Sequence, residues 1–221
     1  MKPRSVVLLS SGLDSTVNLY EAKQVSDVAL AITFDYGQRA AAREIQSAAR
    51  LTTKLGIAHK VLQLEWFKDF TQTSLVNRSA EVPTAQTVKI DDLKQSGETA
   101  KAVWVPNRNG IFLNIAAAFA EGLKANWIVP GFNAEEAATF PDNSQAYLEA
   151  ATHTFKYSTS NHVQVRCFTT QMTKTQIAAR GRELNVDFEM IWPCYFGSEK
   201  PCGECESCQR FTRAIEAGRA I

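Results

Sequence analysis

The chain has 221 residues, of which 45% are hydrophobic and 21% are charged, and its formal net charge at pH 7 is +1. A chain of this length and composition can bury a sizeable core as one domain. It has neither the positive charge typical of nucleic-acid-binding proteins nor an apolar run near the roughly 20 residues of a membrane span. We expect no signal peptide, because residues 1–4 lead into an apolar run too short for one. We therefore expect a cytoplasmic protein with small-molecule partners and with no nucleic-acid or membrane partner.

The first predicted element is a buried strand over residues 5–9, which runs into a hydroxyl-rich turn and then into an amphipathic helix. The backbone N–H groups and hydroxyls of such a turn lie at the positive end of the helix, where phosphate is favoured. Asp14 can hold Mg²⁺ or orient the turn. An ordinary capped strand-to-helix turn is the alternative. The candidate nucleotide-binding residues here are Leu9, Ser10, Ser11, Gly12, Leu13, Asp14, Ser15 and Thr16.

Strand patterns at 28–34, 59–64, 127–132 and 162–168 alternate with helical patterns along the rest of the chain. One predicted helix spans 38–55 and ends at Gly56, a residue suited to the position after a helix. A second spans 111–123, and a third follows the capping-box pair Thr173 and Gln176. The alternation predicts an α/β fold: a doubly wound, Rossmann-like parallel sheet with ligands at the carboxyl ends of its strands.

Residues 66–102 interrupt this alternation with polar, weakly periodic sequence that contains Pro83 and Gly97. Irregular segments of this length are usually a lid, a binding excursion or disordered chain. We treat the segment as a lid-like excursion of a single domain that spans residues 1–221.

Four cysteines near the carboxyl terminus, Cys194, Cys202, Cys205 and Cys208, are spaced C-x7-C-x2-C-x2-C. Four thiolates at such spacing can complete a tetrahedral zinc shell, and iron–sulfur ligation is the rival interpretation. Because four cysteines leave no open metal position, we expect a structural zinc site in the segment 194–221. The fifth cysteine, Cys167, lies in a predicted strand and is expected to be a small core residue.

The turn at residues 10–15 resembles the S-G-G-x-D-S loop of the N-type ATP pyrophosphatases, also called the PP-loop superfamily. Ser11 stands where that motif usually has a glycine, so a positive φ at this position would strain the loop. Further blocks follow in order, at 34–39 (Phe-Asp-Tyr-Gly-Gln-Arg), at 105–109 (Val-Pro-Asn-Arg-Asn) and in the cysteine tail. Together they are similar to the 7-cyano-7-deazaguanine synthase family of queuosine biosynthesis.

The resemblance implies a single ATP pyrophosphatase domain with an adenine nucleotide α-hydrolase-like fold, dependent on ATP and Mg²⁺, with one structural Zn²⁺ per subunit of a homodimer. It also implies a carbon–nitrogen ligase that converts 7-carboxy-7-deazaguanine and ammonia to 7-cyano-7-deazaguanine. In that reaction ATP would adenylate first the carboxylate and then the amide intermediate.

The resemblance also suggests roles for individual residues. Asp14, Ser15 and Lys174 would be catalytic, and Asp35 and Arg108 would join the nucleotide-binding turn. The candidate substrate-binding residues are Arg39, Arg108, Asn109, Glu136, Phe140 and Asp142. Asp35 in a turn and Asn109 as a helix cap are the alternative interpretations of those two residues.

One block departs from the commoner family pattern. Many members carry an aspartate and later an arginine after the strand at 127–132. In this chain Glu136 occupies the acidic position and keeps the charge, but Ser144 stands in place of the arginine. If that arginine binds the substrate carboxylate in relatives, its task would fall here to Arg108, Arg39 or Lys174.

Two other functions remain open at this point. One is another PP-loop adenylating enzyme, of the tRNA thiolation or lysidine type, although the neutral charge disfavours an RNA substrate. The other is a non-catalytic nucleotide-sensing module, which the altered positions Ser11 and 136–144 would permit.

Overall fold

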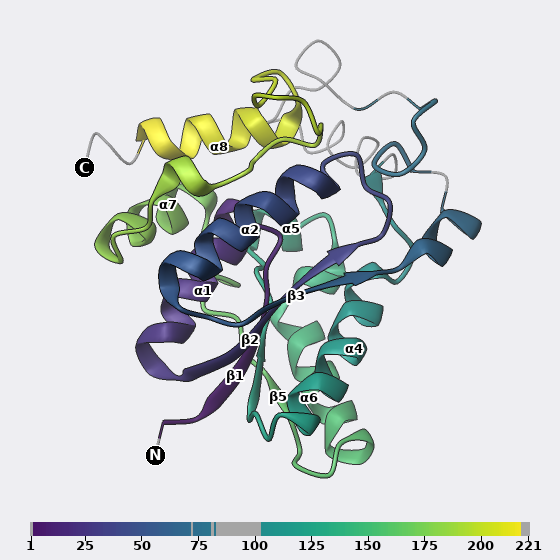
Figure 1. Ribbon diagram of the computed structural model, residues 1–221, viewed down its shortest axis with the longest axis vertical. Coiled ribbons are helices and arrows are strands. Elements are labelled where there is room, and N and C mark those ends of the chain that lie inside the picture. Colours follow the sequence, from purple (N-terminus) through teal and green to yellow (C-terminus); the bar gives the residue numbers. More distant parts are fainter. Residues whose placement is uncertain (1, 72, 81, 83–102, 218–221) are drawn as a thin grey trace.

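A computed structural model describes residues 2–71, 73–80, 82 and 103–217. Its centre is a five-stranded parallel sheet in the order β3-β2-β1-β4-β5 (Figure 1). The order reverses between β1 and β4, which confirms the doubly wound α/β fold. The strands are β1 (Arg4–Leu8), β2 (Asp27–Asp35), β3 (His59–Gln63), β4 (Trp127–Val129) and β5 (Gln164–Val165).

Helices cover both faces of the sheet, with α4 and α6 on one side and α1 and α2 on the other, and α7 and α8 pack outside α1 (Figure 1). The helices are α1 (Leu13–Val25), α2 (Ala41–Leu55), α4 (Arg108–Gly122), α5 (Ala134–Ala137), α6 (Gln145–Ser158), α7 (Lys174–Glu183) and α8 (Glu206–Ala217). Three 3₁₀ turns also occur: η1 (Glu65–Asp69), η2 (Pro141–Asn143) and η3 (Phe188–Met190). None of the helices in the described part of the chain is long and apolar enough to cross a membrane.

Successive side chains of the central strands point to opposite faces of the sheet. Val6 and Ile32 belong to the core under α4 and α6, whereas their neighbours Val7 and Ala31 pack toward α1 and α2. All four side chains are nearly inaccessible to water. A sheet covered on both faces therefore explains why the strands are continuous apolar runs.

Several predicted boundaries are corrected by the structure. Helix α1 is not amphipathic: residues 13–22 are all buried, because the sheet lies on one side and α7 on the other.

Strand β4 ends at Val129, since Pro130 interrupts it and Gly131 turns toward α1. Strand β5 is only two residues long, and His162 before it adopts a left-handed φ of 51°.

The helices were predicted more closely. Gly56 ends α2 with a φ of 66°, and the capping box of Thr173 and Gln176 begins α7, as predicted. Helix α4 begins at Arg108, earlier than expected, so Asn109 lies in its first turn and does not cap it. Helix α6 was not predicted.

The start of the segment 66–102 is more ordered than its sequence suggests. Turn η1 inserts Phe67, which is fully buried, into the main core, and Leu75 joins it there. Residues 72, 81 and 83–102 lie outside the described part of the chain. A lid function for this segment therefore stays a prediction.

Candidate active site

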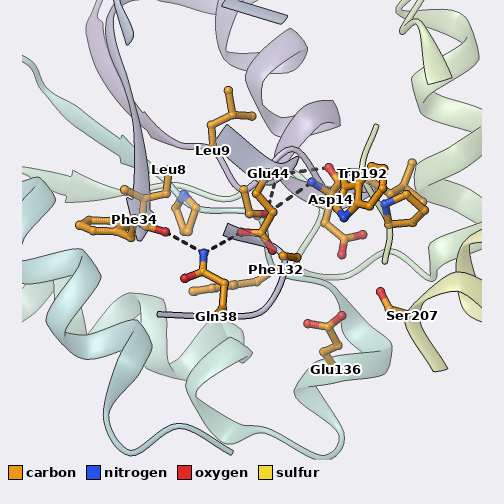
Figure 2. Close-up of a pocket in the computed structure, with 18 of the residues that line it drawn as sticks. Leu8, Leu9, Asp14, Phe34, Gln38, Glu44, Phe132, Glu136, Trp192 and Ser207 are labelled. Carbon is orange, nitrogen blue, oxygen red and sulfur yellow. Dashed lines mark hydrogen bonds between the residues drawn. The ribbon is translucent and has the colours of Figure 1, made fainter. Parts of the chain in front are cut away.

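A cavity of about 250 Å³ lies at the carboxyl ends of β1 and β2, and a second of about 170 Å³ adjoins it. Arg108, Glu136 and Lys174 line both cavities. Figure 2 shows the carboxylates of Asp14, Glu44 and Glu136 directed into the first cavity. The site therefore lies where the strand order of the sheet reverses, the position that this class of fold uses for ligands.

The turn at residues 10–15, the candidate nucleotide-binding turn, forms one wall of the first cavity. Helix α1 begins at Leu13, so its free backbone N–H groups face this space. The Ser10 and Ser15 hydroxyls are 3.1 Å apart, and Gly12 N–H points to Ser10 Oγ at 3.4 Å. A Cβ atom on Gly131 would lie only 2.5 Å from the Ser15 backbone, so the chain leaving β4 must be glycine where it passes the turn.

Ser11 adopts a left-handed φ of 61°. The loop motif usually has glycine at this position, so this conformation is the strained one that the motif led us to consider. The Ser11 side chain is fully buried, and its hydroxyl lies within hydrogen-bond distance of the Ser10 carbonyl oxygen (2.6 Å) and the Glu44 carbonyl oxygen (3.1 Å). The hydroxyl therefore ties the turn to helix α2 in a way that glycine could not.

Lys174 lies between two carboxylates of the site. Its Nζ is 3.1 Å from Asp14 Oδ2 and 2.8 Å from Glu136 Oε1. Burial lowers the pKa of Lys174, but Asp14 and Glu136 outweigh this effect and raise it above its ordinary value. Burial raises the pKa of Asp14, which Lys174 offsets only in part, whereas for Glu136 the ammonium outweighs burial and lowers the pKa. The three groups thus form one charge cluster, in which Asp14 and Lys174 are largely buried and the Glu136 side chain is 37% exposed.

Asp14 Oδ2 also accepts a hydrogen bond from Asn133 Nδ2 at 3.1 Å, whereas its Oδ1 is buried and has no partner among the described residues. An unpaired buried carboxylate oxygen beside a candidate phosphate-binding turn fits a hard cation such as Mg²⁺. Asn133 escaped the sequence analysis, because nothing in the sequence relates it to a carboxylate more than a hundred residues away.

Of the other predicted nucleotide-binding residues, Arg108 lines the cavities, Asp35 stabilises a turn and Thr16 is buried. Arg108 reaches both cavities, and its Nη1 donates to the Tyr36 hydroxyl at 3.2 Å. Asp35 accepts from Gly37 N–H at 3.0 Å, which is the turn interpretation of this residue. Thr16 is fully buried, and its hydroxyl has no partner in the described structure.

The predicted substrate-binding residues divide between the two cavities. Asn109 is buried and lines the first, whereas Asp142 and Phe140 line the second, where Phe140 stacks on Trp104 with ring centroids 5.8 Å apart. Burial raises the pKa of Asp142 above its ordinary value. Arg39 instead donates to the carbonyl groups of Ser74, Asn77 and Ala80 at 2.6–2.9 Å, and so holds the segment that follows η1.

Glu44 is a cavity residue that sequence reasoning missed. Its Oε2 accepts from Gln38 Nε2 at 2.9 Å, and Gln38 is held in turn by the Phe34 carbonyl group and by Tyr36 N–H. Burial raises the pKa of Glu44 to about 7. The only available signal was its spacing from Gln38, which lies just before α2, whereas Glu44 lies in the first turn of that helix.

The four cysteine sulfurs lie within 4.8 Å of one another. The Cys194–Cys202 separation is 3.5 Å, and the Cys202–Cys208 and Cys194–Cys205 separations are both 4.0 Å. Zinc–sulfur bonds of about 2.3 Å in a tetrahedron put sulfurs roughly 3.8 Å apart, so the cluster fits one metal ion. Cys167 lies apart from it, half-buried against the main core.

The segment around the four cysteines also forms part of the wall of the first cavity. Trp192, Tyr195, Ser207 and Phe211 line the first cavity. This placement was not predicted, because the sequence separates the cysteines from the nucleotide-binding turn by most of the chain.

Comparison with known proteins decides the family. The model of the family described as "Queuosine biosynthesis protein QueC" matches residues 4–218. The chain belongs to the QueC family. It is 59% identical to the 7-cyano-7-deazaguanine synthase of Bdellovibrio bacteriovorus, over 95% of this chain and 91% of that protein. It is 49% identical to the enzyme of the same name from Pelotomaculum thermopropionicum, over 96% of each chain. The family resemblance stated from the motifs is thus confirmed.

The fold of this family member is also found in a solved structure of a 4-thiouridine synthetase in complex with RNA and ATP. The TM-score is 0.51 at 14% identity, and the match covers 99% of this chain and 53% of that one. A likeness at this level of identity concerns the fold alone.

Proposed function

We propose that the protein is an ATP-dependent 7-cyano-7-deazaguanine synthase that converts 7-carboxy-7-deazaguanine and ammonia to the nitrile. The observation that carries the proposal is the Asp14–Lys174–Glu136 cluster, which joins the nucleotide-binding turn to the second cavity. It lies in a chain whose relatives in the QueC family carry that enzyme name. The product is a precursor in queuosine biosynthesis.

The turn at 10–15 would hold the pyrophosphate part of ATP through backbone N–H groups and the Ser10 and Ser15 hydroxyls. Mg²⁺, when bound, would be held by Asp14 Oδ1 and would neutralise phosphate charge. Lys174 would favour the charge that develops on the phosphoryl oxygens, because its ammonium is buried and already fixed in place.

In the first half-reaction the substrate carboxylate oxygen attacks the α-phosphorus of ATP, and pyrophosphate leaves. Ammonia then attacks the acyl carbon and displaces AMP, which gives the amide. A second ATP adenylates the amide oxygen, and loss of AMP with the remaining amide protons leaves the nitrile. No covalent bond to the protein is required, so the side chains act by positioning and charge.

The second cavity would bind the deazaguanine. Trp104 and Phe140 offer an aromatic face, and the carboxylates of Glu136 and Asp142 can accept from the N–H groups of a guanine-like edge. Of the three cations considered for the substrate carboxylate, Arg108 is the best placed. Arg39 is occupied by backbone carbonyl groups and Lys174 by two carboxylates.

The four thiols would hold a structural Zn²⁺ that fixes the segment 194–208 against the site. Thiols remain free to bind metal in a reducing compartment, so the proposal places the enzyme in the cytoplasm. It is further proposed to be a homodimer that binds no nucleic acid.

The test is incubation of the purified protein with ATP, Mg²⁺, ammonium and 7-carboxy-7-deazaguanine, followed by mass spectrometry for the nitrile, AMP and pyrophosphate. Nitrile formation that requires all four components is the expected result. Modification of tRNA without nitrile would favour a tRNA-modifying PP-loop enzyme, and ATP binding without AMP release would favour a nucleotide sensor.

A further inference from the structure

Arg210 lies on helix α8, two residues after the metal-binding Cys208, and it also lines the second cavity. Its guanidinium is largely buried between two carboxylates. Nη1 is 3.3 Å from Glu135 Oε2, while Nε and Nη2 are 2.9 Å and 2.8 Å from Glu206 Oε1. Because an arginine fork is rigid and planar, it can hold both carboxylates in one arrangement.

Glu135 connects Arg210 to Lys174, a residue of the candidate active site. While its Oε2 faces Arg210, its Oε1 accepts the backbone N–H of Lys174 at 2.7 Å. Lys174 is the first residue of α7, where backbone N–H groups have no partner inside the helix. Glu135 thus fixes the backbone of the residue whose ammonium lies between Asp14 and Glu136.

A continuous set of contacts therefore links a metal-bearing helix to the buried ammonium. The exposed fractions of the side chains are 18% for Arg210, 23% for Glu135 and 12% for Lys174. At such burial, charged contacts are less screened than at an open surface, and loss of one partner leaves the others poorly satisfied.

We propose that Arg210 and Glu135 are a positioning pair, which fixes the start of α7 and thereby the Lys174 ammonium between Asp14 and Glu136. This inference rests on the proposed function only for its effect on catalysis. The positioning itself is a property of the folded chain. Helix α8 then has two tasks, since it supplies a metal ligand and supports the site.

The first variants are Arg210→Gln and Glu135→Gln. Glutamine at 135 loses the charge pair with Arg210, and its neutral amide oxygen, no longer fixed by the guanidinium, accepts the Lys174 N–H more weakly than the carboxylate does. A displaced Lys174 ammonium should lower kcat by about tenfold, with the KM for ATP changed less than about twofold. Arg210→Lys should recover part of the loss, because an ammonium can contact one carboxylate but not both in the planar arrangement.

Arg180→Gln is the matched control. Arg180 lies on the same helix α7 and pairs with Glu21 and Glu183, away from both cavities. Its loss should affect stability without the fall in kcat. All variants are checked for metal content by elemental analysis.

Two readouts separate positioning from a general structural role. Amide hydrogen exchange at Lys174 should become about tenfold faster in both pair variants, relative to global unfolding, but not in Arg180→Gln. In a double-mutant cycle, Arg210→Gln should add little to the single-turnover defect of Lys174→Gln, because both changes act through one ammonium.

Unchanged exchange at Lys174, or effects of Arg210→Gln and Lys174→Gln that simply add, would overturn the proposal. Loss of metal from both pair variants would also overturn it, since the pair would then support the metal site alone. Failure of the wild-type protein to form the nitrile would instead contradict the proposed function and leave the exchange result standing.

Discussion

Trp192 donates its backbone N–H to the carbonyl oxygen of Ser11 at 2.9 Å. The bond joins the segment that enters the four-cysteine cluster to Ser11, the one left-handed residue of the turn at 10–15. The left-handed conformation of Ser11 points its carbonyl oxygen toward Trp192, and a right-handed conformation would point it away. The conformation of the turn and the placement of the four-cysteine segment therefore depend on each other.

Substitutions at Ser11 should separate strain from bonding. Ser11→Ala keeps the cost of the left-handed conformation and removes the one hydroxyl proton that the Ser10 and Glu44 carbonyl groups share, so we expect a loss of about 2 kcal/mol of unfolding free energy. Ser11→Gly relieves the strain and should lie within about 1 kcal/mol of the wild type. Urea denaturation of the three proteins measures the difference. An alanine variant as stable as the glycine variant would contradict this account.

Asp14→Asn should lower kcat by at least about 100-fold while the protein stays folded, because asparagine keeps the shape of the side chain but removes the charge that faces Lys174 and that would hold Mg²⁺ under the proposed function. AMP and pyrophosphate release measure turnover, and circular dichroism measures the fold. The control is Asp27→Asn, which alters an exposed ion pair with Arg4. Full activity of Asp14→Asn would remove Asp14 from the catalytic assignment.

Metal content provides a third test. The purified protein should contain one zinc per chain, and Cys205→Ser should lose it together with thermal stability, since metal binding and folding are coupled at a thiolate site. Because Trp192 and Tyr195 line the first cavity, loss of the metal should also weaken ATP binding, measured by calorimetry. Cys167→Ser is the control and should keep the metal. Iron and a visible absorption band would instead indicate an iron–sulfur cluster.

Glu44 should make stability depend on pH. Burial raises its pKa from 4.5 to about 7, so the folded state binds more protons than the unfolded state between these values. The contribution of Glu44 to the free energy of unfolding is therefore fully present below the unfolded pKa of 4.5, and it is lost as the pH rises through about 7. The shift corresponds to roughly 3 kcal/mol as an upper bound.

Glu44→Gln should abolish this part of the pH dependence and should be more stable than the wild type at pH 8. Urea denaturation between pH 5 and pH 8 tests it, with Glu149→Gln on the exposed face of α6 as the control. Parallel stability curves for Glu44→Gln and the wild type would show that burial of this carboxylate has no net cost.

Local patterns were sufficient to predict the sheet, the turn and the metal cluster. Apolar runs such as Val6–Leu8 can be satisfied only when both faces are covered, and a hydroxyl-rich turn after such a run lies at a helix start. The cysteine spacing brings four thiols together within one short segment. Each of these inferences depends on residues that are close in sequence.

Only the tertiary structure could place side chains that meet over long sequence separations. Four contacts show this: Asn133 and Lys174 with Asp14, Arg210 with Glu135, and Trp192 with Ser11. Each joins residues that are far apart in the sequence, so no local sequence pattern predicts it. The same limit explains the misjudged helix α1. Its sequence shows which residues are apolar, but its burial on nearly all sides depends on α7 packing over it, because an element's environment is set by neighbours distant in the chain.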